Sequence, residues 1–170
     1  MSAPECSYFA TCFRGLEEVL AAELRGGEIR AEAVEPGVSG VSFKGDQEVG
    51  YRACLWLRSG IRVLSELGRS PAKGPDELHA WACTLPWTKL LRLDQTFSVE
   101  ARVWDSNLTH SKYASYRIKD ALCDVFREAT GARPNVDPTR AELPLFLSLY
   151  QNEAILYRDV EVVGKALLRA

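Results

Sequence analysis

The order of strand-like and helix-like stretches in the first 67 residues is the feature that most limits the possible folds. Ser7 to Phe13 is short, aromatic and contains threonine, which predicts a strand. After Gly15, apolar residues recur at positions 16, 19, 20 and 24, the spacing of an amphipathic helix, and Gly26-Gly27 ends that helix. The chain is therefore predicted to begin with a strand followed by a helix.

Two strands, a second helix and a further strand follow. Ile29, Ala31 and Ala33 alternate with charged residues and predict a half-buried strand, and Pro36-Gly37 marks a turn. The next strand is predicted at Val38, Val41 and Phe43, a helix from an Asp46 N-cap to about Leu57, and a strand at Ile61 to Leu67. This βαββαβ order is that of a ferredoxin-like domain.

The second half of the chain begins with a predicted linker at 69–76, which holds two prolines, one glycine and three charged residues. A short helix is predicted from Pro75 to about Thr84. Thr96 to Val103 is predicted as a strand with Phe97, Val99, Ala101 and Val103 on one face and Ser98, Glu100 and Arg102 on the other. We therefore predict an α+β chain with one domain at 1–70 and a second at 71–170.

The most periodic helix of the sequence is predicted to begin after Ser111, as its N-cap, and to end at Gly131. A loop at 133–143 follows, and then two strands at 145–150 and 153–158 joined by a turn at Gln151-Asn152. A last strand is predicted at Val162 to Leu168.

Composition indicates a globular protein without a membrane segment. Hydrophobic residues make up 46% of the 170 residues and charged residues 26%, and no apolar run approaches about 18 residues. Charged residues come too early at the N-terminus for a signal peptide. The five cysteines include no CxxC pair, which favours free thiols in a reducing compartment. We expect a cytoplasmic protein with no membrane partner.

Motifs of the common enzyme classes are missing from the sequence. It contains neither GxGxxG nor GxxxxGK[ST], and no GxSxG, HExxH or HxE…PCxxC. The cysteine spacing does not suit zinc, so we predict no metal site. Cys83 follows His79 by four residues and would share a helix face with it, but apolar neighbours favour a buried, inert thiol. We predict no catalytic residue here.

Positive charge is concentrated in the middle of the chain. Residues 51–119 carry eleven Lys or Arg and six Asp or Glu, although the net charge of the chain is −2. The acid-free segment at the start of the long helix supplies our main candidates for RNA binding: His110, Ser111, Lys112, Tyr113, Tyr116, Arg117 and Lys119. Helix N-termini and cations attract phosphate, and tyrosine can stack on an unpaired base. In the alternative interpretation both tyrosines pack on the sheet and the cations are only solvated.

A second basic run supplies weaker candidates for RNA binding. Arg58 and Arg62 would share one face of a strand, and Arg102 lies on the polar face of its own strand. The tryptophans, among them Trp104, are predicted mostly at core or domain-junction positions.

Four stretches resemble a known family: YFATCFRGLEEVLAAEL (8–24), GVSFKGD (40–46), YRACLWLRSGIRVL (51–64) and SKYASYRIKDALCDVFREATGARPNVD (111–137). They resemble the N-terminal half of THUMP-containing RNA methyltransferases of bacteria and archaea. The chain looks most similar to the enzymes that methylate the exocyclic amine of guanine, guanine-N2, in large-subunit ribosomal RNA.

The resemblance implies a ferredoxin-like domain followed by an α/β THUMP domain. In this family the THUMP domain often begins earlier than the boundary predicted above at residue 71, near residue 46. The family uses this pair to bind structured RNA, here ribosomal rather than transfer RNA, and to present a nucleotide to a separate catalytic domain.

No glycine-rich methyl-donor loop and no (D/N)PP(Y/F) motif is present in the sequence. The resemblance therefore implies a piece of a longer enzyme that binds no cofactor itself. S-adenosylmethionine would bind to a C-terminal methyltransferase domain of the parent. A free-standing THUMP protein is the alternative.

Two other functions compete with RNA binding. The acidic first fifty residues and the tryptophan-rich stretches could dock another protein domain as a scaffold, which would require an exposed apolar patch. A small acylphosphatase-like enzyme would need an anion cradle with an arginine and an asparagine. Arg14 beside Gly15 is the nearest match, but that segment contains no asparagine.

Overall fold

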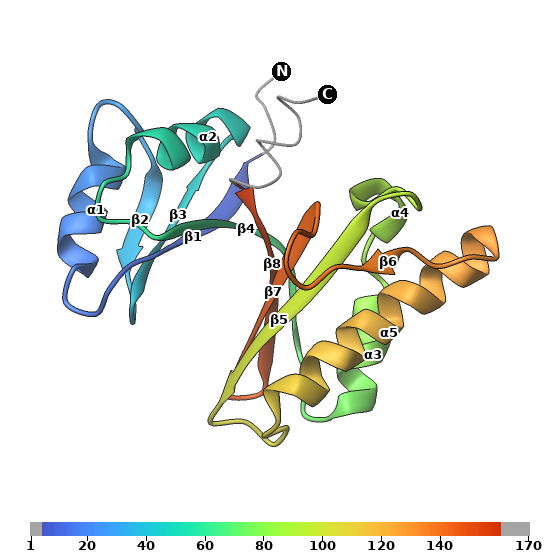
Figure 1. The fold of residues 1–170 in the computed structure, drawn as a ribbon. Helices are drawn as coiled ribbons and strands as arrows, with labels where there is room; N and C mark the ends of the chain where they lie inside the picture. Colours follow the sequence, from blue (N-terminus) through green and yellow to red (C-terminus); the bar gives the residue numbers. More distant parts are fainter. Residues whose placement is uncertain (1–4, 161–170) are drawn as a thin grey trace. The chain divides into compact units, whose positions relative to one another are not determined.

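The computed structural model describes residues 5–160, which belong to two compact units (Figure 1). Of the described residues, 5–66 together with 159 and 160 belong to unit 1, and Leu67–Arg158 form unit 2. The strand predicted at Val162 to Leu168 lies outside the described residues.

Unit 1 is a four-stranded antiparallel sheet with two helices. Its elements follow in the order β1 (Cys6–Thr11), α1 (Glu17–Arg25), β2 (Glu32–Pro36), β3 (Gly40–Gly45), α2 (Gln47–Trp56) and the first part of β4 (Arg62–Pro71). The strand order is β2-β3-β1-β4, and every neighbouring pair is antiparallel. The βαββαβ sequence and this strand order confirm the predicted ferredoxin-like domain.

Both helices of unit 1 pack on the same face of its sheet. Leu20, Leu24 and Ala53 from the helices share one core with Ala10 and Phe43 from the strands. The predicted N-cap is confirmed, because Asp46 Oδ1 accepts the Val49 N–H at 3.0 Å.

A close approach of backbone and ring fixes how α2 sits on β1. A side chain at Gly50 would place its Cβ only 2.8 Å from the Tyr8 ring. The same ring carries the hydroxyl that donates to the carbonyl of Asp46, at 3.1 Å. Glycine at position 50 is therefore required by packing.

The second strand differs from its predicted position. It begins at Glu32, not near Ile29, because Ile29 is buried in a turn whose N–H groups at 29 and 30 donate to the carbonyl of Gly26. Arg30 and Ala33 have positive φ angles of 58° and 46°, which interrupts the alternation of an extended strand. Val38 is likewise outside β3 and exposed. Of the three alternating apolar residues at 29, 31 and 33, only Ile29 is buried, and it lies in a turn and not in the strand.

Unit 2 is a mixed sheet with three helices. After the second part of β4, its elements are α3 (Pro75–Cys83), α4 (Trp87–Leu90), β5 (Thr96–Trp104), α5 (Ser111–Thr130), β6 (Asn135–Val136), β7 (Leu143–Tyr150) and β8 (Glu153–Asp159). The strand order is β4-β8-β7-β5-β6, with β5 parallel to β6 and β7, and β7 antiparallel to β8. This arrangement agrees with the α/β architecture that the resemblance implies.

Helices α3 and α5 lie side by side on one face of this sheet (Figure 1). Phe97 of β5 and Leu145 of β7 point to that face and are fully buried, as is Ile118 of α5. Because side chains alternate along a strand, Arg102 and Trp104 lie on the opposite face, where both are exposed.

Several predicted boundaries in unit 2 need correction. The predicted linker at 69–76 begins inside β4, which runs to Pro71 and is held there by an ion pair between Arg69 and Glu153 at 3.4 Å. Ser111 is the first helical residue of α5, and the N-cap is His110. Strand β7 begins two residues before its predicted start, and α4 and β6 are additional short elements. The turn at Gln151-Asn152 is confirmed, with positive φ angles of 48° and 59°.

Candidate nucleic-acid interface

The start of α5 has backbone amides that its N-cap side chain leaves unsatisfied. His110 occupies the N-cap position and makes no capping hydrogen bond with its side chain. The first turn also contains no acidic residue. Since the first amides of a helix have no partner within the helix and carry the positive end of its dipole, this end of α5 attracts anions.

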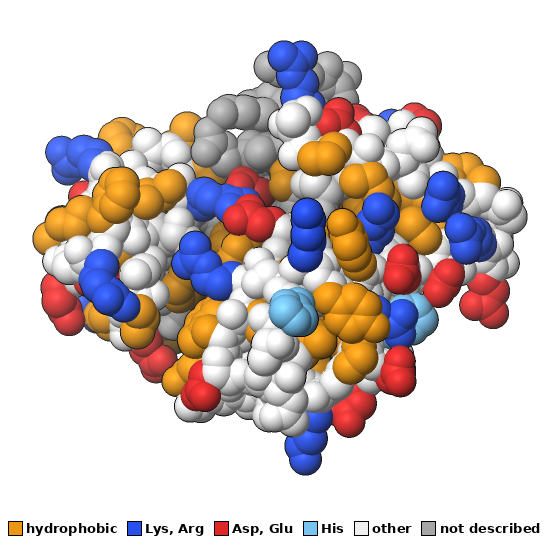
Figure 2. All heavy atoms as spheres, turned by 60° about the horizontal axis from the view of Figure 1, so that its bottom comes forward, with side chains coloured by type: hydrophobic (Ala, Val, Ile, Leu, Met, Phe, Trp, Pro, Cys, Tyr) orange, Lys and Arg blue, Asp and Glu red, His pale blue; other side chains and the backbone are white. Residues whose placement is uncertain are grey.

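Aromatic and basic side chains alternate on the exposed side of the same helix. Tyr113 is 47% exposed and Tyr116 49%, so neither tyrosine packs into the core. This contradicts the alternative in which both tyrosines cover the sheet. The ammonium of Lys119 lies 5.7 Å from the centroid of the Tyr116 ring, a cation–π geometry. Figure 2, which brings the lower end of Figure 1 forward, shows Lys and Arg side chains beside hydrophobic ones.

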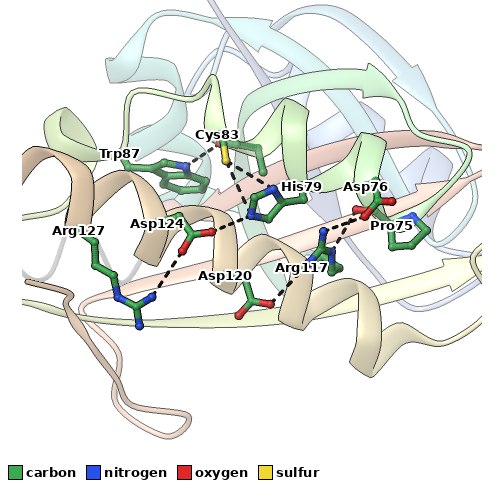
Figure 3. A network of polar contacts seen from close by, with 10 residues as sticks. Pro75, Asp76, His79, Cys83, Trp87, Arg117, Asp120, Asp124 and Arg127 are labelled. Atoms are coloured by element: carbon green, nitrogen blue, oxygen red, sulfur yellow. Dashed lines mark hydrogen bonds and ion pairs between the residues drawn. The ribbon is translucent and has the colours of Figure 1, made fainter.

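Arg117 lies on the same helix but is already bound within the protein (Figure 3). Its Nε donates to the carbonyl of Pro75 at 3.2 Å, and its guanidinium also reaches Asp76 Oδ1, at 3.2 Å. Its side chain is only 22% exposed. Arg117 therefore ties α5 to the first turn of α3, and less of its charge faces solvent than that of Lys112.

The three other predicted arginines lie outside α5. Arg62 donates from Nε to Asp159 Oδ2 at 3.1 Å, and both residues belong to unit 1. Arg58 lies before β4 begins, so the prediction that it shares a strand face with Arg62 is wrong. Arg102 is exposed on the face of β5 opposite to α5.

Sequence reasoning missed an aromatic pair at the ends of two neighbouring strands. Trp104 ends β5 and Tyr150 ends β7, and the parallel register sets them directly opposite each other. Their rings are stacked, with centroids 5.2 Å apart and an interplanar angle of 23°. In the sequence, Trp104 directly follows one predicted strand and Tyr150 ends another. No local pattern indicates that they meet, because the pairing depends on a parallel register between distant segments.

The Cys83–His79 pair forms the contact that its spacing predicts, but not an activated nucleophile (Figure 3). Cys83 Sγ lies 3.8 Å from His79 Nδ1 and 4.0 Å from Nε2, and Nε2 in turn lies 3.0 Å from Asp124 Oδ2. Burial raises the pKa of the Cys83 thiol, and the Asp124 carboxylate raises that pKa further. The thiol is therefore protonated at neutral pH, the opposite of what nucleophilic catalysis needs.

The loop that would serve as the anion cradle of an acylphosphatase is occupied by a carboxylate. Glu17 accepts the Gly15 N–H at 2.8 Å and the Ser39 N–H at 3.0 Å. Hydrogen bonds from its own N–H and from Ser39 hold the pKa of Glu17 below its ordinary value, so the carboxylate is charged at neutral pH. A second anion at these amides would be repelled.

Residues 5–160 contain neither a candidate metal site nor a candidate membrane span. No cluster of three or more His, Cys, Asp or Glu side chains there could hold a metal ion. None of the helices in that range is both long enough and apolar enough to cross a membrane.

Comparison with known proteins identifies both units. The model of the RlmL ferredoxin-like domain matches residues 7–64, and the model of the THUMP domain matches residues 72–159. The chain is 36% identical over 162 residues to ribosomal RNA large subunit methyltransferase K/L of Magnetococcus marinus and 38% identical over 160 residues to that of Syntrophotalea carbinolica. These matches cover 95% and 94% of this chain but 22% of each relative.

A solved structure shows the same fold. The crystal structure of a predicted N6-adenine-specific DNA methylase from Listeria monocytogenes superposes with a TM-score of 0.78 at 28% identity, covering 92% of this chain and 40% of that one. The chain spans about a fifth of the length of the curated relatives named above. Together with the two matched domains, these likenesses show that the chain belongs to the THUMP domain family and carries an RlmL ferredoxin-like domain before its THUMP domain.

Proposed function

We propose that unit 2 binds structured RNA through the start of α5, and that the chain is the RNA-binding part of a methyltransferase. The observation that carries this proposal is a helix start with no side-chain cap, where Lys112, Tyr113 and Tyr116 are exposed and Lys119 is half-buried. Phosphate contacts would come from the lysines and the helix amides, and stacking from the tyrosines. His110 and Ser111 belong to the same surface.

The relatives support the class of RNA. Two of them are named as ribosomal RNA large subunit methyltransferases, so we propose ribosomal RNA as the partner. On the sequence resemblance alone, we propose guanine-N2 as the methylated position. We assign the methyl donor, S-adenosylmethionine, and the chemical step to a separate catalytic domain. The role of this chain is then to position the RNA.

Charge reversal at two positions tests the site. The variant Lys112→Glu/Lys119→Glu is compared with Arg133→Glu/Arg140→Glu, which changes the net charge equally but alters residues beyond the other end of α5. That helix has 20 residues and is therefore about 30 Å long. Binding to a ribosomal RNA hairpin is measured by fluorescence anisotropy at about 50 and 200 mM salt, with duplex DNA as a further comparison.

We expect the lysine variant to bind the hairpin about tenfold more weakly, with a flatter salt dependence, because two phosphate contacts are lost. The arginine variant should bind almost as the parent does. Equal losses in the two variants would show that only net charge matters and that the site is wrong. No RNA binding by the parent chain at the lower salt concentration would contradict the proposed function itself.

A second function, docking of another protein domain, is favoured by one observation in unit 1. Leu55 and Trp56 at the end of α2 are both exposed, as is Val19 of α1. Large exposed apolar side chains are typical of interaction surfaces. Size-exclusion chromatography of the chain mixed with a methyltransferase domain of a relative tests this function. If the two proteins dock, the parent chain elutes with that domain, and a Trp56→Ala variant should elute separately from it.

A further inference from the structure

The stacked pair of Trp104 and Tyr150 is a surface feature of unit 2. Trp104 is 44% exposed and Tyr150 42%, so nearly half of each ring is in contact with water. Both side chains lie on the sheet face opposite to α5, because Phe97 on β5 and Leu149 on β7 point toward the helices. The pair is therefore not part of the core beneath α5.

The backbone around the pair is held by side-chain hydrogen bonds. The Asn107 N–H donates to Asn152 Oδ1 at 2.8 Å, and the Asn152 N–H donates to Ser106 Oγ at 3.1 Å. Gln151 Nε2 donates to Asp105 Oδ2 at 3.2 Å. These bonds join the loop after Trp104 to the turn after Tyr150, so the two rings are fixed before any partner arrives, which lowers the entropy cost of binding.

Arg102 supplies a positive charge on the same face of the sheet as the pair. Arg102 precedes Trp104 by two residues, so it lies on the same face of β5, and it is exposed. Acidic side chains also lie nearby. Glu100 is exposed two residues before Arg102 on the same face of β5. Glu153, opposite Tyr150 in the β7–β8 register, pairs with Arg69 at 3.4 Å, and Asp105 accepts from Gln151. The six-residue loop after Trp104, residues 105–110, connects β5 to the start of α5, where His110 and Lys112 lie.

We propose that Trp104 and Tyr150 form a stacking platform for an unpaired base of the bound RNA, and that Arg102 contacts a phosphate beside that base. The inference rests on the proposed RNA binding and specifies its substrate, an RNA with single-stranded nucleotides next to a helix. Every base has an aromatic face, so the platform selects unpaired over paired nucleotides rather than one sequence over another.

Two RNAs separate this inference from the general proposal. One is a blunt ribosomal RNA hairpin, and the other is the same hairpin with a single-stranded extension of about four nucleotides. Affinities are measured by anisotropy for the full 170-residue chain and for Trp104→Ala, Tyr150→Ala and Trp104→Phe. Trp56→Ala, which removes an exposed tryptophan from unit 1, is the matched control. Thermal unfolding checks that each variant is folded.

We expect the parent to prefer the extended hairpin, and both alanine variants at 104 and 150 to lose about 10- to 100-fold in affinity for it. Their affinity for the blunt hairpin should change little, and Trp104→Phe should keep most of the parent's preference. Tryptophan fluorescence should fall when the parent, but not Trp104→Phe, binds the extended hairpin.

Three results would overturn the inference. If Trp104→Ala keeps the preference for the extended hairpin, or if it loses both RNAs equally, the platform does not bind an unpaired base. If the variant binds RNA normally but no longer elutes with a methyltransferase domain, the pair is a protein contact. In each case the salt-dependent binding of the blunt hairpin by the parent still supports the proposed function, whereas absence of all RNA binding would refute that function.

Discussion

Glu23 accepts three hydrogen bonds from the segment that follows α2, through a single carboxylate oxygen. Its Oε2 lies 2.9 Å from the N–H nitrogen of Arg58, 3.2 Å from that of Ser59 and 3.1 Å from the hydroxyl oxygen of Ser59. Burial by itself would raise the pKa of Glu23, but these hydrogen bonds outweigh it and lower that pKa. The carboxylate thereby fastens α1 to the loop before β4.

This arrangement predicts a loss of stability for Glu23→Gln, because an amide oxygen is a weaker acceptor than a carboxylate. We expect the free energy of unfolding at pH 7 to fall by about 1 kcal/mol. The folded-state pKa lies below the unfolded value of about 4.3, so the contribution is complete above that pH and is lost as the pH falls through the folded value. The stabilities of parent and variant, measured by urea unfolding, should therefore converge as the pH falls through the folded-state pKa of Glu23. Glu18→Gln, on the exposed side of α1, is the control and should change little.

Arg117 is expected to matter for stability through its contacts with α3. Arg117→Gln removes the charged bonds to Pro75 and Asp76 and should lower the free energy of unfolding by about 1 kcal/mol. Arg127→Gln on the same helix loses only a 3.7 Å ion pair with Asp124 at the surface and should change stability much less. Urea unfolding monitored by tryptophan fluorescence compares the two. Equal stability of both variants would show that Arg117 does not fasten the helices.

The reactivity of Cys83 should depend on Asp124. Because burial and the Asp124 carboxylate raise the pKa of the thiol, alkylation at pH 7 should be slower than that of a free cysteine. Asp124→Asn removes the negative charge, lowers the pKa and should accelerate alkylation of Cys83. Peptide mapping by mass spectrometry distinguishes Cys83 from the other four cysteines. If alkylation of Cys83 is faster in the parent than in the variant, Asp124 does not raise the pKa of the thiol.

Gly131 should be sensitive to substitution because of its backbone angle alone. It ends α5 with a φ of +77°, and nothing lies within 4 Å of the position that a Cβ would occupy. Gly131→Ala should cost about 1 kcal/mol of stability through the left-handed conformation. Gly27→Ala, equally uncrowded but without such a φ, is the matched control and should be close to neutral. Thermal unfolding of the pair isolates the backbone effect from packing.

Some features of the candidate site could be predicted from the sequence and others could not. The helix bearing Lys112 and Lys119 was found from charge and periodicity within one segment. Charge and periodicity could not predict that Arg117 binds the start of α3. Its partners lie 41 and 42 residues earlier in the chain. The misplaced strand near Ile29 has a related cause, since burial of an apolar residue in a turn produces the same pattern as one face of a strand.

The sequence by itself determined the order of helices and strands in the first 64 residues, both ends of α2, the C-terminal end of α5, and the family. These features depend on hydrogen bonds and burial between near neighbours, such as the Asp46 cap and the Gly131 terminus. Only the tertiary structure decided which side chains meet on the surface. Trp104 and Tyr150 are separated by an entire helix and a loop, and their stacking follows from the parallel register of β5 and β7. That register is set by the packing of the whole sheet against α3 and α5, which no local pattern contains.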